Sequence, residues 1–346
     1  MTVLLAGRTT FGIGGPASSF EDATSIAELI DATRSADAAG EPLFVLSGGS
    51  NVLVSDDGFA GTVVHVANMG VQSHIDDDNV LLLVSAGETM DHLVATTVDN
   101  GWAGLEALSG IPGLVGAAPV QNIGAYGSEI AANVVSIGVW DRERNRTRVL
   151  SASKCGFGYR DSVIKSSRQQ GQATSRYVVL EVLFELRPSS LSAPIAYSEL
   201  AKTLGVEMGA RAPISEVRAA VLKLRQSKGM VYDPVDPDTH GAGSFFTNPV
   251  LTSDDAGRLP SDAPRYEQPD GRVKTSAAWL IDHAGFNKGY GDGPARLSSK
   301  HTLALTNQGG AKASDVTALA RLIQSGVEAK FGVKLQPEPV LVGVDL

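Results

Sequence analysis

The stretch Gly110-Ile-Pro-Gly-Leu-Val-Gly-Ala-Ala-Pro-Val-Gln-Asn-Ile-Gly-Ala-Tyr-Gly127 decides the fold, because it concentrates glycine among small residues and carries no charge. Glycine lets backbone amides approach an anion without an intervening Cβ, and successive N–H groups can form a nest for phosphate oxygens. A shorter segment of the same kind is Ser47-Gly-Gly-Ser-Asn51. We call residues 110–127 the long glycine loop and residues 47–51 the short glycine loop. Together they predict a diphosphate group that is held from two sides.

The glycine spacing argues against the two commonest phosphate-binding motifs. In the long glycine loop the glycines recur as G-x-x-G-x-x-G and are interrupted by Pro112 and Pro119, which differs from the G-x-G-x-x-G of dinucleotide-binding folds. No G-x-x-x-x-G-K-[ST] occurs in the sequence, so a P-loop is also excluded. Rossmann and P-loop folds are therefore disfavoured.

Composition indicates a folded chain without broad affinity for polyanions. The 346 residues are 43% hydrophobic and 19% charged, which predicts two domains or one domain with a large second lobe. The net charge of -9 argues against nucleic acid as a partner, because such binding needs clustered cations. Four alternating arginines at positions 142, 144, 146 and 148 predict a solvated strand face in a hairpin-like stretch.

Cysteine usage and hydropathy indicate a cytoplasmic protein. Cys155 is the single cysteine, which excludes an intramolecular disulfide and fits a reducing compartment, and we interpret it as a buried small residue. The N-terminal residues lack the basic and apolar regions of a signal peptide, and no apolar run of about 18 residues follows, so no membrane partner is expected. The six histidines show no ligand spacing, so no metal site is expected.

Start and stop signals predict an α plus β first half and a second half after Pro188. The expected strands span residues 43–46, 52–54, 62–66 and 80–85. The first expected helix begins at the capping box of residues 25–28. Three more are expected over residues 88–100, 215–227 and 276–284, and a last helix is expected to be capped by Ser314 and ended by Gly332. Polar loops at residues 229–243 and 252–272 carry few core residues and are typical of the surroundings of a site.

Five motifs occur in order along almost the whole chain. They are Leu46-Ser-Gly-Gly-Ser-Asn-Val-Leu53, Gly113-Leu-Val-Gly-Ala-Ala-Pro-Val-Gln-Asn-Ile-Gly-Ala-Tyr-Gly127, Gly158-Tyr-Arg-Asp-Ser162, Gly243-Ser-Phe-Phe246 with Asn248-Pro249, and Pro337-Glu338. This ordered set resembles the bacterial UDP-N-acetylenolpyruvoylglucosamine reductase (MurB) family. Each motif is long enough that their shared order is very unlikely to arise by chance.

The resemblance implies an α+β flavoenzyme of peptidoglycan precursor synthesis. Residues 1–190 would form an FAD-binding domain of the vanillyl-alcohol-oxidase (PCMH) type, with subdomains of about 1–67 and 68–190, followed by a smaller α+β substrate-binding domain over residues 191–346. NADPH would reduce the bound FAD and leave. The enolpyruvyl ether of UDP-N-acetylglucosamine would then be reduced to UDP-N-acetylmuramate. A monomer is expected.

The resemblance also implies three catalytic residues. Arg160 would present a planar, permanently charged guanidinium to the negative charge that hydride transfer leaves in the substrate carboxylate. Glu338 would assist in a protonated or proton-sharing form, because a bare carboxylate repels an enolate. Ser244 would donate the proton to the enolate carbon, since a positioned weak acid suffices against a strongly basic carbanion.

Further site residues follow from the same resemblance. Lys228 would lie near the nucleotide diphosphate and the nicotinamide phosphate, and Tyr197 would lie in a loop that covers the substrate. The expected substrate-binding residues are Tyr126, Tyr197, Lys228 and Asn248. The expected FAD-binding residues are Ser47, Gly48, Gly49, Ser50, Asn51, Val52, Ile111, Pro112, Gly113, Gly116, Gln121, Asn122, Ile123, Gly124, Ala125 and Gly127.

Departures from the family pattern and two alternative functions stay open. Val340 stands where many relatives carry an arginine, Ala117 and Ala118 replace serines, and Lys300-His301 stands where some relatives have Gln.

One alternative function is an FAD-dependent oxidase or dehydrogenase of the same fold that acts on a hydroxy acid or alcohol, but it leaves Ser244 and Glu338 without roles. The other is a nucleotide-sensing or scaffold protein without turnover.

Overall fold

The computed structural model describes residues 2–346, which fold into two compact units. Unit 1 contains Ala17–Gly49 and Phe59–Val231 with the first residues of the chain, and unit 2 contains Leu4–Pro16, Ser50–Gly58 and Tyr232–Leu346. Residues 191–231 thus group with unit 1, whereas we expected a domain boundary at residue 190. The division into an FAD-binding domain over residues 1–190 and a substrate-binding domain over residues 191–346 stays a prediction. Within residues 2–346, no helix has both the length and the apolar character needed to cross a bilayer.

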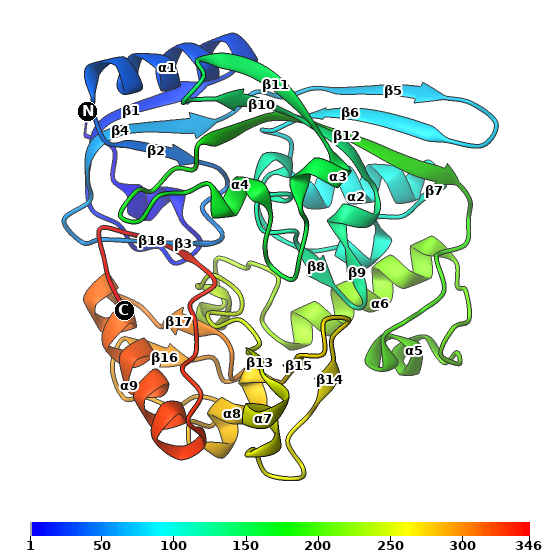
Figure 1. Cartoon of the computed structure of the whole chain (residues 1–346), viewed down its shortest axis with the longest axis vertical. Coiled ribbons are helices and arrows are strands. Elements are labelled where there is room, and N and C mark those ends of the chain that lie inside the picture. The colour runs from blue at the N-terminus through cyan, green and yellow to red at the C-terminus, as the bar shows by residue number, and fades with distance from the viewer. Residues whose placement is uncertain (1) are drawn as a thin grey trace. The chain divides into compact units, whose positions relative to one another are not determined.

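A small parallel sheet begins unit 1. Its order is β1 (Ala17–Ala23), β4 (Phe59–Val66) and β2 (Leu43–Leu46), and α1 (Ile26–Ala39) lies along one face of it (Figure 1). The predicted cap is confirmed, because Ser25 accepts a hydrogen bond from the Glu28 amide at 3.2 Å. The Glu28 carboxylate also accepts the amide hydrogen of Thr24, at 2.7 Å.

A larger antiparallel sheet forms the rest of the unit 1 framework. Its strand order is β11-β10-β12-β6-β5, and β7 pairs with the end of β12. The strands are β5 (Val71–Ile75), β6 (Val80–Ser85), β7 (Trp102–Ala103), β10 (Val134–Asp141), β11 (Arg146–Ser151) and β12 (Tyr177–Pro188). Strand β6 alternates buried and half-buried residues, which is the two-residue period of a strand with one face on a core. Helix α2 (Met90–Asp99) packs its apolar side into the same core.

Short helices complete unit 1. They are α3 (Ala152–Cys155), α4 (Val163–Ser166), α5 (Ser198–Leu204) and α6 (Ile214–Ser227). Helices α5 and α6 share a small core of their own. Arg218 of α6 also forms an ion pair with Asp91 of α2, 2.7 Å between Nη1 and Oδ1, which helps explain why α6 groups with unit 1. Cys155 is fully buried, as expected, and burial raises the pKa of its thiol to about 11.

Unit 2 combines short strands with two core helices. A parallel pair joins β3 (Val52–Val54) to β18 (Val340–Val342). Around it lie the pair β16 (Ala295–Leu297) with β17 (Leu305–Asn307) and the sheet β13 (Val250–Leu251), β15 (Val273–Lys274) and β14 (Tyr266–Glu267). Helices α8 (Ala277–His283) and α9 (Ala313–Phe331) close over a core that includes Phe245 and Phe246, and α7 (Ser253–Gly257) is a single turn.

The expected Ser314 cap of the last helix is wrong. Helix α9 begins at Ala313, and the carboxylate of Asp56 accepts hydrogen bonds from the amides of Ala313 (2.8 Å) and Ser314 (3.3 Å). A distant carboxylate thus satisfies amides that a helix start leaves without intrahelical partners, and it also suits the positive end of the helix dipole. The end at Gly332, which is left-handed with a φ of 68°, is confirmed.

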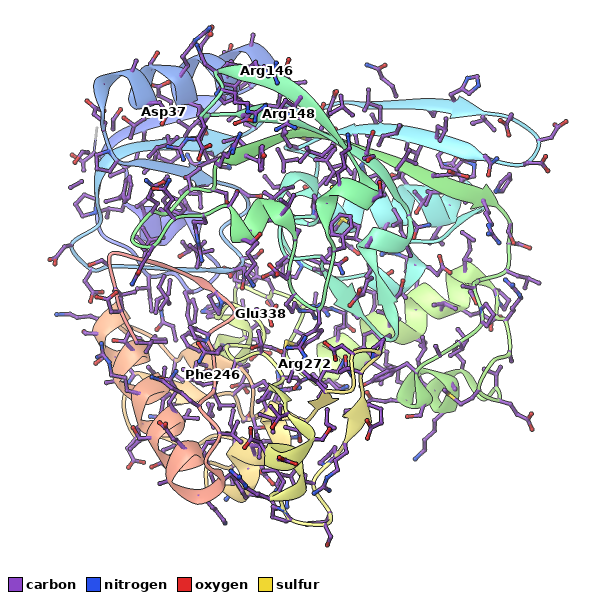
Figure 2. All side chains as sticks on the ribbon, viewed as in Figure 1. Asp37, Arg146, Arg148, Phe246, Arg272 and Glu338 are labelled. Carbon is purple, nitrogen blue, oxygen red and sulfur yellow. The ribbon has the colours of Figure 1, made fainter. Side chains whose placement is uncertain are left out.

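The arginine stretch is a hairpin, but only part of it is solvated. Arg144 and Arg146 are exposed as expected, whereas Arg148 donates to the fully buried Asp141 at 3.0 Å. Arg176 donates to the same carboxylate at 2.7 Å. The hydrogen bond from Arg176, followed by that from Arg148, lowers the pKa of Asp141 to about 2. Figure 2 labels Arg146 and Arg148 on this hairpin.

We expect Asp141→Asn to lower the free energy of unfolding at pH 7 by about 3 kcal/mol, because it leaves two arginines without their buried counter-charge. The folded-state pKa of Asp141 lies below the unfolded value of about 3.9. Its contribution is therefore complete above that pH and is lost as the pH falls toward 2. Denaturation curves from pH 7 to pH 3 should show the deficit shrinking below about pH 4. Asp31→Asn, at an exposed helical position, is the control; equal losses in both variants would contradict the assignment.

Candidate functional site

The two glycine loops touch in unit 1. A Cβ added to Gly48 would lie 2.8 Å from the Cα of Gly113, so only glycine fits at this approach. Beside it, the buried Oγ of Ser47 has no hydrogen-bond partner among residues 2–346. A buried hydroxyl without a partner costs about 1–3 kcal/mol, so a bound polar group is expected to supply one. The arrangement fits a phosphate-bearing cofactor.

Part of the long glycine loop is held by backbone hydrogen bonds. The amides of Val115, Gly116 and Ile123 donate to the carbonyls of Glu88 (2.8 Å), Ala86 (2.9 Å) and Ala118 (3.0 Å). Gly116 and Ile123 could therefore bind a cofactor only through atoms other than their amide hydrogens. The anion nest that we predicted for the whole stretch is confined to its remaining amides.

Asn122 holds the long glycine loop from inside. Its side chain is buried, and its Nδ2 donates to Glu129 Oε2 at 2.7 Å and to the Gly158 carbonyl at 3.0 Å. Its Oδ1 accepts from the Ala131 amide at 3.2 Å, and its backbone is left-handed with a φ of 47°. The side chain that we expected at the cofactor therefore bonds extensively within the protein and links the long glycine loop to the Tyr-Arg-Asp-Ser motif.

Arg160 is also bound to the long glycine loop. Its Nη2 donates to the Gly124 carbonyl at 2.8 Å, and the Oγ of nearby Ser162 donates to the Val120 carbonyl at 2.5 Å. Arg160 has a φ of 54°, a left-handed conformation that costs a non-glycine residue roughly 1–3 kcal/mol. Such strain persists where the surroundings fix the conformation, and it clusters at functional sites. The structure thus joins two of the predicted motifs around a strained arginine.

Two charged residues beside the long glycine loop escaped the sequence analysis. Asp91 Oδ1 accepts the amide hydrogen of Gly110 at 2.6 Å while its carboxylate pairs with Arg218. Arg225 lies against the same glycine, and burial lowers the pKa of its guanidinium to about 10, so it stays charged at neutral pH. The sequence could have indicated Arg225 through its place on α6, because it lies four residues after the buried Val221 and so on the same inward face of the helix.

Three of the four expected substrate residues lie together in unit 1. The rings of Tyr126 and Tyr197 meet edge to face with centroids 5.5 Å apart, and Lys228 Nζ lies 5.6 Å from the Tyr126 centroid. Burial raises the pKa of Tyr126 to about 12, so its phenol is neutral at physiological pH. The fourth, Asn248, lies in unit 2, where its Oδ1 accepts the amide hydrogen of Ala277 at the start of α8 at 2.9 Å.

Ser244 and Glu338 both belong to unit 2 and lie on neighbouring segments. The Glu338 amide donates to the carbonyl of Phe245, the residue after Ser244, at 2.9 Å, and Phe246 pairs with Pro337. Figure 2 labels Phe246 and Glu338. Asn51 of the short glycine loop donates from Nδ2 to the Glu338 carbonyl at 3.4 Å. Two expected catalytic residues and one expected cofactor ligand are thereby brought together.

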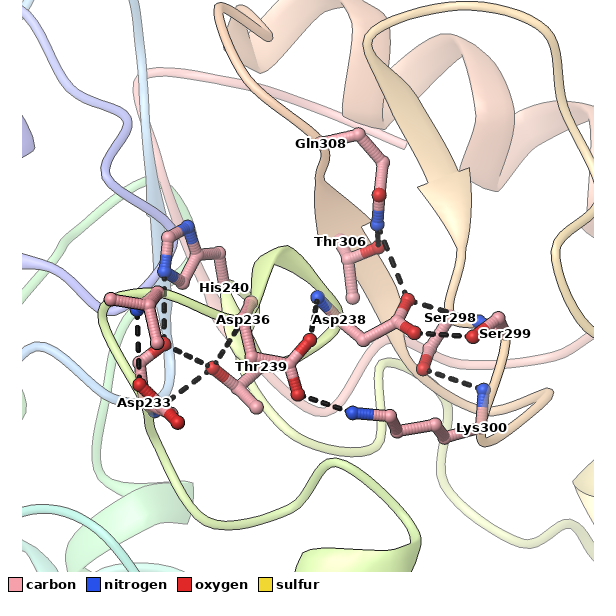
Figure 3. A network of polar contacts seen from close by, with 11 residues as sticks. Asp233, Asp236, Asp238, Thr239, His240, Ser298, Ser299, Lys300, Thr306 and Gln308 are labelled. Carbon is pink, nitrogen blue, oxygen red and sulfur yellow. Dashed lines mark hydrogen bonds and ion pairs between the residues drawn. The ribbon is translucent and has the colours of Figure 1, made fainter.

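A polar network supports the segment that precedes Ser244 (Figure 3). Lys300 pairs with Asp236, chiefly by a hydrogen bond that raises the pKa of the lysine, and Ser299 bonds Asp238. The Phe245 amide donates to the Leu303 carbonyl at 2.7 Å on the other side. Lys300, one of the departures from the family pattern, therefore contributes to this support. In the described part of the chain no cluster of three or more His, Cys, Asp or Glu could hold a metal ion.

Two protein-family models match the chain in separate regions. A model described as an FAD binding domain matches residues 20–148, and a model described as UDP-N-acetylenolpyruvoylglucosamine reductase, C-terminal domain, matches residues 234–342. The first region contains both glycine loops, and the second contains Ser244 and Glu338. The expected α+β fold with an FAD-binding domain is confirmed, and so is FAD as the cofactor.

Whole proteins with a similar sequence or structure cover nearly the full chain. The UDP-N-acetylenolpyruvoylglucosamine reductase of Thermobifida fusca (strain YX) is 53% identical over 99% of this chain and 98% of its own length. The protein of the same name from Streptomyces coelicolor is 50% identical over 99% and 90%. The crystal structure of the UDP-N-acetylenolpyruvylglucosamine reductase (MurB) from Thermus caldophilus superposes with a TM-score of 0.67 at 27% identity, over 99% of this chain and 98% of that one.

We expect Gly48→Ala to weaken FAD binding by roughly tenfold or more, because its methyl group would press on the Gly113 backbone and overpacking of this kind costs about 1–3 kcal/mol. The measurement is a titration of the deflavinated protein with FAD, followed by flavin fluorescence. Gly7→Ala is the matched control, since a Cβ there meets nothing within 4 Å. An unchanged dissociation constant in Gly48→Ala would remove this contact from the cofactor site.

Proposed function

The chain belongs to the UDP-N-acetylenolpyruvoylglucosamine reductase family, and from that premise we propose which of its residues carry the reaction. The protein is an FAD-dependent oxidoreductase that uses NADPH to reduce the enolpyruvyl group of UDP-N-acetylenolpyruvoylglucosamine in peptidoglycan precursor synthesis. The observation that supports the residue assignment best is the backbone link between Glu338 and the Ser244 segment, within the region that matches the family's C-terminal domain.

Ser47, Gly48 and Gly113 are the residues that we propose to hold FAD. Their close backbone approach and the buried hydroxyl suit a phosphate group, and the other predicted FAD residues lie in the two glycine loops or, for Val52, directly after the short one. When bound, FAD would supply hydride transfer between NADPH and the enolpyruvyl group. The chain has to supply binding, charge stabilisation and a proton.

Arg160 is our proposed stabiliser of the charge that develops on the substrate carboxylate. Its side chain is anchored on the Gly124 carbonyl, and its backbone carbonyl accepts a hydrogen bond from Lys165 Nζ at 2.7 Å, so little reorganisation is needed when the charge appears. A guanidinium stays charged at any physiological pH. Glu338 would support the same charge as a hydrogen-bond donor, which requires that its carboxyl group carries a proton.

Ser244 is our proposed proton donor. It follows Gly243, whose φ of 68° allows the tight turn, and backbone hydrogen bonds of Phe245 hold the segment on both sides. A hydroxyl held in this way can donate to a strongly basic carbon although it is a weak acid in water. Lys228 and Tyr126 would bind the nucleotide diphosphate, since a lysine ammonium acts as a compact point charge for phosphate.

We also propose that the protein works in the cytoplasm as a monomer. Its single cysteine suits a reducing compartment, and both the substrate and NADPH are small charged molecules. Size-exclusion chromatography with light scattering measures the oligomeric state directly, and a larger mass than one chain of 36.0 kDa would overturn the monomer.

An absorption spectrum tests the activity and its cofactor together. Purified protein should be yellow, anaerobic NADPH should bleach the flavin band, and UDP-N-acetylenolpyruvoylglucosamine should then restore it. A bleached flavin that the substrate does not reoxidise would favour the oxidase or dehydrogenase alternative. Colourless protein that takes up no added FAD would instead favour a nucleotide-sensing or scaffold role.

We expect Ser244→Ala to separate the two halves of the reaction. Reduction of the flavin by NADPH should proceed at the normal rate, while turnover with substrate should fall by about 10²–10⁴-fold, the usual contribution of a general acid. Rapid-mixing absorbance measures each half. Thr247→Val removes a hydroxyl from the same segment and should leave both rates unchanged. An unaltered steady-state rate in Ser244→Ala would remove this residue as proton donor.

A further inference from the structure

Lys228 is held by a carboxylate from the segment that carries Tyr197. Its Nζ lies 2.5 Å from Glu199 Oε2 and 5.6 Å from the ring centroid of Tyr126. Glu199 is the second residue of α5, two positions after Tyr197, whose ring meets Tyr126 edge to face. The start of α5 is therefore attached to the site by an ion pair and by an aromatic contact, both within unit 1.

We propose that Glu199 is an internal competitor of the nucleotide diphosphate for Lys228. Glu199 pairs with the ammonium group until a diphosphate displaces it, and the displacement breaks the ion pair between Lys228 and the start of α5. The inference rests on the proposed role of Lys228 as a diphosphate ligand. It identifies a residue that sets the affinity for the nucleotide without contacting it.

Charge balance supports the competition. A carboxylate carries a single negative charge, whereas a diphosphate brings more charge and more acceptor oxygens to the same ammonium group. Glu199 and a diphosphate could share Lys228 only with like charges a few Å apart, which is repulsive. The side chains of Lys228 and Glu199 are 28% and 40% exposed, so water screens the ion pair and exchange of partners is inexpensive.

The fold does not need this ion pair to place α5. Leu200 and Ala201 of α5 are buried in the small core shared with α6. The preceding segment is fixed by backbone hydrogen bonds, from the Ile195 amide to the Ala210 carbonyl at 2.8 Å and from the Gly209 amide to the Ile195 carbonyl at 2.9 Å. Removing the Glu199 charge should therefore leave the helix in place and change the availability of Lys228.

Calorimetric titration of the holoenzyme with UDP at low ionic strength tests the proposal. Exposed ion pairs of this kind change an equilibrium constant by up to about fivefold, so Glu199→Gln should tighten UDP binding by about two- to fivefold. Glu207→Gln makes the same change in net charge at an exposed position just beyond α5 and is the matched control, with UDP affinity unchanged. Far-UV circular dichroism and flavin content verify that each variant is folded.

A double-mutant cycle identifies the partner through which Glu199 acts. Lys228→Met should weaken UDP binding, and adding Glu199→Gln to it should change nothing further. A Glu199→Gln variant with unchanged or weaker UDP affinity, or with the same gain in the Lys228→Met background, would overturn the proposal. Unchanged UDP affinity in Lys228→Met alone would remove Lys228 as a diphosphate ligand and the inference with it. Reoxidation of reduced flavin by the substrate tests the reductase activity separately.

Discussion

The backbones of the two glycine loops meet at Gly48 and Gly113 at a distance that admits no side chain. Several elements of unit 1 hold the two loops at this distance. Strand β2 ends just before the short glycine loop, and the Met90 amide at the start of α2 donates to the Gly113 carbonyl at 3.0 Å. The small parallel sheet therefore positions the short glycine loop, the α2 region positions the long one, and the spacing between the two loops is fixed. Gly113 has a φ of 106°, which essentially only glycine adopts without strain.

The loops keep their shape with little regular secondary structure of their own. Side chains from distant segments bond their backbone groups instead: Asp91 accepts from Gly110, Arg160 donates to Gly124, and Ser162 donates to Val120. Hydrogen bonds that involve a charged group are stronger than neutral ones, and they strengthen further where water is excluded. A loop fixed in this way can present a preorganised surface to a ligand, because little ordering remains to be done on binding.

The sequence predicted what local signals encode. The Ser25 cap, strand β6 and the glycine end of α9 depend on neighbours within a few residues, and the motif order carried the family, the cofactor and the activity. What it missed depends on contacts across the chain. Asp56 caps a helix that starts more than 250 residues later, and Asp141 draws Arg148 away from solvent. The sequence places Arg225 on the apolar stripe of α6, but its burial against Gly110 depends on a contact with a residue more than 100 positions away.

The left-handed backbone at Arg160 has a consequence for the evolution of the family's stability. Glycine would adopt that conformation at no steric cost, and asparagine would tolerate it, so either substitution relieves strain. Both would also remove a guanidinium that no other side chain replaces in charge and shape. Selection for thermal tolerance alone would favour their spread at this position, whereas the proposed role of the guanidinium in the reaction would select against them. With the role that we propose for Arg160, the protein retains a less stable backbone at this residue in exchange for chemistry.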